Sequence, residues 1–219
     1  MTDDALELSS TQARVLGSLL EKEMTTPDAY PMTLNALTTA CNQSSNRDPV
    51  VKYQATQVET AVLTLKAKGL ARVVHPGAGD RVTKYRQVVD EVLGLWDAER
   101  AVICVLLLRG AQTVAELRSR SERLHQFRSA DEVEAALQAL ATRQPPFVAK
   151  VDRQPGQKED RWIQLMEVGA AERAAASASA VPSVTASTRG AGRVEELEER
   201  VATLEGQVAH LLEALGEQP

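Results

Sequence analysis

Two nine-residue segments decide the fold: QVETAVLTL (57–65) and EVEAALQAL (132–140) align almost residue for residue. In each segment the apolar side chains recur three or four positions apart, which is the spacing of one face of an α-helix. The inward positions correspond in order, Val58, Val62 and Leu65 with Val133, Leu137 and Leu140. The chain therefore contains a repeat, and each copy places an amphipathic helix at the same point.

The repeat extends towards the N-terminus of each segment. The stretches QARVLGSLLEKEM (12–24) and ERAVICVLLLRG (99–110) carry the same apolar spacing and predict a first helix in each copy. A second, shorter helix is predicted to begin after Thr33 in one copy and after Thr113 in the other, because threonine is a good N-cap. Glu116 follows Thr113 by three residues and completes a capping box.

A strand-like segment follows the third helix of each copy. Residues 70–88 run LARVVHPGAGDRVTKYRQV, and residues 147–165 run FVAKVDRQPGQKEDRWIQL, each with a glycine-containing turn between β-rich flanks. Tyr85 and Trp162 occupy matching places on the two returning strands. Each copy is therefore predicted to end in a two-stranded wing.

Three helices followed by a wing, found twice, are typical of two winged-helix domains in tandem. The sequence predicts an α+β fold that is mostly α, with a first winged helix over residues 1–92 and a second over 93–168. The alternative is a generic α+β chain whose halves resemble each other by chance. Agreement between two independent segments argues against that alternative.

The composition changes after the second copy. Residues 169–192 are rich in alanine and serine and predict a flexible linker. Residues 193–216 then repeat apolar residues at heptad spacing, with mostly valine at a and leucine at d, which favours a two-stranded parallel coiled coil. The positions expected to form a homodimer are Val194, Leu197, Val201, Leu204, Val208, Leu211 and Leu215. The alternative is a single amphipathic helix that packs back on the domains.

Three stretches carry a resemblance to a known family: LLEKEMTTPDAYPMTLNALTTACNQSSNRDPVVKY (19–53), ICVLLLRGAQTVAELRSRS (103–121) and PFVAKVDRQPGQKEDRW (146–162). Over residues 8–166 the chain resembles the YceH-like family of uncharacterised bacterial proteins. The resemblance implies two winged helices and no known catalytic activity. It names no ligand, because none is established for the family.

Composition excludes several function classes. The two cysteines, Cys41 and Cys104, lie far apart in helical patterns, which predicts core residues in a reducing, cytoplasmic protein. His75, His125 and His210 lack co-ligands at metal-binding spacing, so we expect no metal and no cofactor. No serine or cysteine has an activating partner, so an enzyme is not expected. No apolar run is long enough to span a membrane.

Double-stranded DNA is the partner predicted for the first domain. Residues 44–86 carry eight lysines and arginines against three carboxylates, a local charge of +5 in a chain of net charge −5. A third helix that packs its apolar face inward turns Gln57 and its threonines outward, where they can read base edges. The expected contacts are Arg47, Lys52, Thr56, Gln57, Thr60, Thr64, Arg72, Arg81 and Lys84. The alternative is a solvated surface without a partner.

The loop after the second helix of the first domain has two interpretations. Asn42, Gln43, Asn46 and Arg47 either form a recognition edge beside the third helix or stabilise turns through their own hydrogen bonds. The sequence slightly favours the recognition edge.

The second domain is expected to bind protein and not DNA. Its third helix contains Asp131, Glu132 and Glu134, which suit a helix N-terminus but repel phosphates. The sequence thus predicts a non-enzymatic, DNA-associated or regulatory binding protein. The alternative function is a protein–protein scaffold that uses its winged helices for partner binding.

Overall fold

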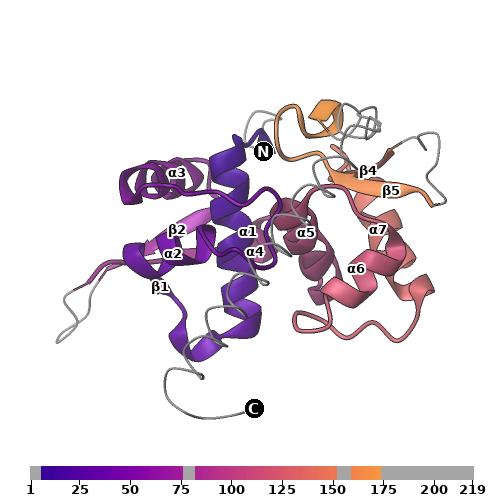
Figure 1. The fold of residues 1–219 in the computed structure, drawn as a ribbon, viewed down its shortest axis with the longest axis horizontal. Coiled ribbons are helices and arrows are strands. Elements are labelled where there is room, and N and C mark those ends of the chain that lie inside the picture. The colour runs from indigo at the N-terminus through magenta and orange to yellow at the C-terminus, as the bar shows by residue number, and fades with distance from the viewer. Residues whose placement is uncertain (1–5, 76–81, 152–158, 174–219) are drawn as a thin grey trace, which may run out of the picture. The chain divides into compact units, whose positions relative to one another are not determined.

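The computed structural model describes residues 6–75, 82–151 and 159–173, all within one compact unit. The fold is α+β and mostly helical, with two small antiparallel sheets (Figure 1). The first half contains α1 (Ser10–Thr25), the 3-10 turn η2 (Pro27–Ala29), β1 (Met32–Thr33), α2 (Leu34–Cys41), α3 (Ala55–Ala67), β2 (Ala71–Val74), β3 (Lys84–Gln87) and α4 (Val89–Leu93). The second half contains α5 (Asp97–Arg109), α6 (Val114–Arg120), α7 (Ala130–Ala141), β4 (Val148–Val151) and β5 (Arg161–Gln164).

Both predicted strand pairs are present. In the first half β3 lies between β1 and β2, and Tyr85 faces Val73 across the antiparallel ladder. In the second half β4 pairs with β5, and Trp162 faces Lys150. Tyr85 and Trp162 are each the second residue of the returning strand, so the correspondence predicted from the repeat is confirmed.

The helix boundaries follow the capping residues in the sequence. Thr33 caps α2, and Thr113 forms the predicted capping box with Glu116 at the start of α6. Gly69, at φ +77°, ends α3, and the backbone N–H of Leu70 donates to the carbonyl of Leu65 at 2.9 Å. This 6→1 bond turns the chain directly from α3 into β2.

The first helices of the two halves, α1 and α5, pack against each other at the centre of the molecule (Figure 1). Gly17 permits their close approach, because a Cβ at that position would lie 2.9 Å from the side chain of Leu108. The thiol of Cys104 lies 3.5 Å from the carbonyl oxygen of Gly17. Both predicted core cysteines, Cys41 and Cys104, are fully buried.

The two ends of the described chain are joined by backbone hydrogen bonds. The N–H of Leu8 donates to Met166 at 2.7 Å, and the N–H of Val168 donates back to Leu8 at 2.9 Å. The halves predicted as residues 1–92 and 93–168 thus share one core, and the boundary between them stays a prediction. Residues 174–192 of the predicted linker, and the whole predicted coiled coil, lie outside the described residues.

Candidate functional site

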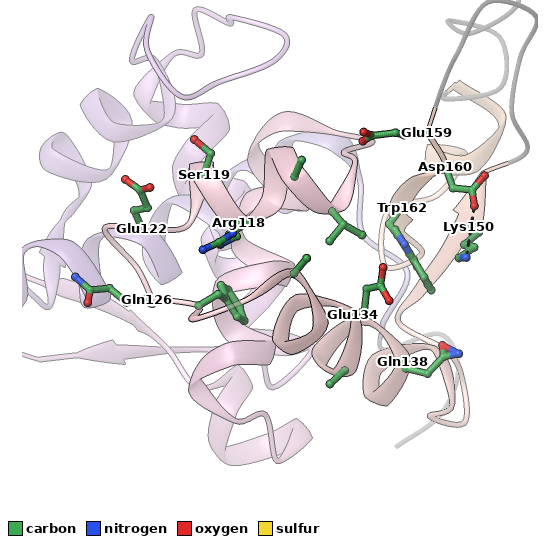
Figure 2. A pocket seen from close by; sticks show the side chains of 15 residues that line it. Arg118, Ser119, Glu122, Gln126, Glu134, Gln138, Lys150, Glu159, Asp160 and Trp162 are labelled. Carbon is green, nitrogen blue, oxygen red and sulfur yellow. Dashed lines mark ion pairs between the residues drawn. The ribbon is translucent and has the colours of Figure 1, made fainter.

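A groove of about 1120 Å³ crosses the second half between α6, α7 and the β4–β5 pair (Figure 2). Its apolar lining comes from Val114 on α6, Phe127 in the following loop, and Trp162 on β5. Alanines of α6 and α7 contribute the rest of that lining, and their small side chains leave the space open. Phe127 and Trp162 are only 8% and 6% exposed, so the apolar surface left open in the groove is mainly that of Val114 and the alanines.

Charged residues surround this apolar surface. Lys150 is already engaged: its Nζ lies 3.6 Å from Asp160 and 5.3 Å from the ring centroid of Trp162. Arg118 donates to the carbonyl of Arg128 at 3.2 Å. By contrast, three lining carboxylates make no ion pair within the described part of the chain, namely Glu122, Glu134 and Glu159. The groove is therefore apolar at its lining and acidic around it.

A second hollow of about 530 Å³ adjoins the groove and shares Phe127 and Ala135 with it. Trp96, the residue before α5, lines this hollow and is 78% exposed, the largest exposed fraction among the exposed large apolar side chains of the described residues. Ala98 and Ala139 lie in the same lining. Exposed tryptophans are enriched where proteins bind one another, so this surface extends the groove as a candidate contact area.

Only part of the polar face predicted on α3 is exposed. Thr56, Gln57 and Thr60 are exposed, whereas Thr64 is half-buried. The Thr60 hydroxyl donates to the Thr56 carbonyl at 2.9 Å, and the Gln57 side chain accepts the N–H of Gln54 at 2.8 Å. The side chains of Gln57 and Thr60 hydrogen-bond to the backbone of their own helix or its N-cap, which their outward position alone did not indicate.

The basic residues predicted around α3 are partly neutralised. Arg72 and Arg86 both contact Glu91, at 3.3 and 2.8 Å. Glu91 lies just beyond the segment whose local charge suggested DNA. Lys52 is exposed and Lys84 half-buried, and Arg81 lies outside the described residues. The cationic surface is therefore weaker than the count of charges indicated.

Arg47 is a correction to the predicted DNA contacts. Its side chain is fully buried and donates to both carboxylate oxygens of Glu21, at 3.0 and 2.7 Å, and to the carbonyl of Ala40. Burial on its own would raise the pKa of Glu21, but the hydrogen bonds and charge of Arg47 bring it below its ordinary value. Arg47 therefore binds a buried carboxylate and is not available to a nucleic acid.

The neighbouring polar residues hold the same loop, which favours the turn-stabilising interpretation over the recognition edge; Asn46 stays exposed. Asn42 exchanges two hydrogen bonds with the backbone of Tyr53, at 2.8 and 2.7 Å. Gln43 accepts from Lys22 and from Arg47. One signal in the sequence indicated that a basic side chain is buried here. Glu21 directly follows the buried leucines of α1, and a carboxylate in such surroundings needs a charged partner.

The chemistry of the described residues gives no activated nucleophile or metal cluster. Burial raises the pKa of both thiols, Cys41 and Cys104, and so disfavours the reactive thiolate. Within residues 6–75, 82–151 and 159–173, no group of three or more histidines, cysteines and carboxylates is placed to hold a metal ion. In the same ranges no helix is both long and apolar enough to cross a membrane.

The described residues form an α+β, mostly helical fold with a groove on its second half. The chain belongs to the family described as "Protein of unknown function, DUF480", whose model matches residues 8–157. It is 45% identical to a UPF0502 protein of Shewanella sp. (strain MR-7) over 96% of both chains. It is 52% identical to one of Citrifermentans bemidjiense over 72% of this chain and 73% of that protein. The expected membership of an uncharacterised bacterial family is confirmed.

Proposed function

We propose that this protein is a non-enzymatic binding protein built from two winged helices, and that the groove of its second half takes up a basic segment of a protein partner. The observation that carries the proposal is the groove with three carboxylates, Glu122, Glu134 and Glu159, that make no ion pair among the described residues. The two free cysteines support a reducing compartment, so we place its activity in the cytoplasm.

The position of the groove explains why protein is favoured over DNA there. In winged helices that bind DNA, the third helix enters the major groove and the wing contacts the backbone. Here the groove lies between that helix, α7, and the wing formed by β4 and β5. Glu134 projects from α7 into this space, and Asp160, the residue before β5, borders it (Figure 2). Carboxylates at these positions repel phosphates and attract lysine or arginine.

The partner segment is expected to combine apolar anchors with positive charge. An amphipathic helix or extended peptide with that pattern would pack on Val114 and the exposed alanines of α6 and α7 while its cations met the acidic residues around them. The chain's own C-terminal segment does not fit this description, because residues 193–216 contain six glutamates and only two arginines. Charge complementarity therefore favours another protein over residues 193–216 as the occupant of the groove.

A pair of designed peptides tests the proposal. One fluorescently labelled peptide carries leucines at helical spacing with lysines elsewhere, and its twin carries glutamates in place of the lysines. Fluorescence anisotropy with the full chain is expected to show binding of the basic peptide alone. The variant Glu134→Lys is expected to weaken that binding by about tenfold or more, since reversing one charge in a desolvated contact costs at least about 1.4 kcal/mol.

Glu59→Lys is the matched control, because Glu59 is exposed on α3 and does not line the groove. It changes the net charge of the protein by the same amount as Glu134→Lys. Equal losses in both variants would mean that only the overall charge matters. Equal binding of both peptides would remove the case for a basic partner.

Binding of DNA by the first half is a second candidate, favoured by the exposed Lys52, Thr56 and Thr60 around α3. A regulator of transcription would use this face. Anisotropy with random duplex DNA tests it: affinity should fall steeply as salt rises, because each phosphate contact releases counterions. Absence of binding at low salt would leave the protein-binding function alone.

A further inference from the structure

A small hollow of about 180 Å³ lies where the first and second halves meet, away from the groove. Basic residues from both halves line it. Lys22 is in the last turn of α1, Arg109 in the last turn of α5, and Arg120 in the last turn of α6, and Arg123 follows in the next loop. A cation in a last turn complements the helix dipole, and three such helices end at this point.

The positive charge exceeds what the fold neutralises. Glu21 is the one carboxylate among the described lining residues, and it is shared between Arg47, which binds both its oxygens, and Lys22, whose Nζ lies 3.2 Å from it. Arg109 contacts only the neutral amide of Asn46, and the side chain of Arg123 makes no hydrogen bond or ion pair within the described part of the chain. Four cations therefore line the hollow beside one carboxylate: Lys22 pairs with Glu21 and Arg120 with Glu116, whereas Arg109 and Arg123 have no carboxylate partner within the described residues.

Burial lowers the pKa of Arg109, and the positive charges of Arg120 and Arg47 lower it further. Like charges held this close repel one another, and a bound anion would relieve the repulsion. Guanidinium groups also present paired N–H donors that match phosphate oxygens.

We propose that this hollow is a binding site for a small phosphate-bearing molecule, held by Lys22, Arg109 and Arg123. The volume equals about six water molecules in liquid, which is room for one phosphate group or a diphosphate but not for a nucleotide. Cys104, Val105 and Leu108 form an apolar floor that keeps water from screening the charges. Arg120, which also contacts Glu116 at 3.3 Å, closes the hollow from α6.

The test uses inorganic phosphate and pyrophosphate with the full chain, by calorimetric titration and by thermal unfolding. One equivalent of either ion is expected to bind and to raise the unfolding midpoint above that in sodium chloride of the same ionic strength. Arg123→Gln is expected to lower the affinity by about tenfold or more, since it removes a charge-assisted hydrogen bond. Arg109→Gln is expected to do the same, and Arg123→Gln remains informative if Arg109→Gln does not fold.

Arg128→Gln is the matched control, because it removes an arginine from the same loop that does not line the hollow. Its affinity for pyrophosphate is expected to equal that of the unaltered chain. Equal losses from Arg123→Gln and Arg128→Gln would overturn the site, as would equal stabilisation by chloride. Displacement of pyrophosphate by a short DNA duplex would assign the arginines to nucleic acid and also overturn the proposal.

Discussion

The guanidinium of Arg47 and the carboxylate of Glu21 form a two-pronged ion pair that joins the loop after α2 to α1. The Arg47 side chain is 0% exposed and the Glu21 side chain 10%. Arg47→Met is expected to lower the free energy of unfolding by up to about 3–5 kcal/mol, because the nearly buried carboxylate of Glu21 then keeps only Lys22 as its partner. Denaturation with urea measures the change.

Arg86→Met serves as the control for that measurement. Arg86 also contacts a carboxylate, that of Glu91, but the Glu91 side chain is 43% exposed. Solvent screening limits such a pair to about 0–1 kcal/mol. If Arg47→Met and Arg86→Met lowered the free energy of unfolding by similar amounts, burial would not make the Glu21 pair more important than an exposed one.

The two ionisable residues Glu21 and Glu23 are expected to affect stability with opposite dependence on pH. The pKa of Glu21 is lower in the folded protein, so its stabilisation is present above its unfolded pKa and is lost as pH falls through the folded pKa. Glu21→Gln should therefore flatten the loss of stability below about pH 4. Chemical denaturation across a pH series measures the slope.

Burial, and then the nearby charge of Asp90, raise the pKa of Glu23 above its ordinary value. The pH dependence of stability therefore has the opposite sign to that of Glu21. The protonated form of Glu23 favours folding, and that contribution is lost as pH rises through the folded pKa. Glu23→Gln should therefore be more stabilising at neutral pH than at acid pH. Parallel pH profiles for Glu21→Gln and Glu23→Gln would contradict both assignments.

Gly17 sets the distance between α1 and α5. Gly17→Ala is expected to cost about 1–3 kcal/mol, because the new methyl group would lie 2.9 Å from the Leu108 side chain. Leu108→Ala on its own should also destabilise the protein, by leaving a cavity. The double variant should lose less than the sum of the two, since the small residue makes room for the methyl group. Strict additivity in urea denaturation would show that the two residues do not compete for space.

Much of the fold could be predicted from the sequence because local signals determine it. The helix periodicity around Val58 and Val133, the caps Thr33 and Thr113, and the stop at Gly69 all act within a few residues. The packing of α1 on α5 could not be predicted. It depends on Gly17 meeting Leu108, a contact between residues far apart in the chain.

The candidate site was predicted less well, because charge was counted without its partners. Arg47 looked like a surface cation, yet Glu21, distant in sequence, holds it in the core. Arg72 pairs with Glu91, which the counted segment did not include. The acidic α7 pointed towards a protein partner, but the groove needed Phe127 and Trp162 to be brought together in space.

The last prediction concerns assembly and depends on the sequence of residues 193–216. We propose that the heptad positions, among them Val201 and Leu204, join two chains in a parallel coiled coil. A chain ending at Gly192 is then expected to be monomeric by light scattering, with less than half the mass of the full-length dimer. Leu204→Lys in the full chain should also give a monomer, because a buried lysine opposes the contact, whereas Glu199→Lys at the outward f position should leave the dimer intact. A full chain that is already monomeric, or a truncated chain that is still a dimer, would show that these residues do not join the subunits.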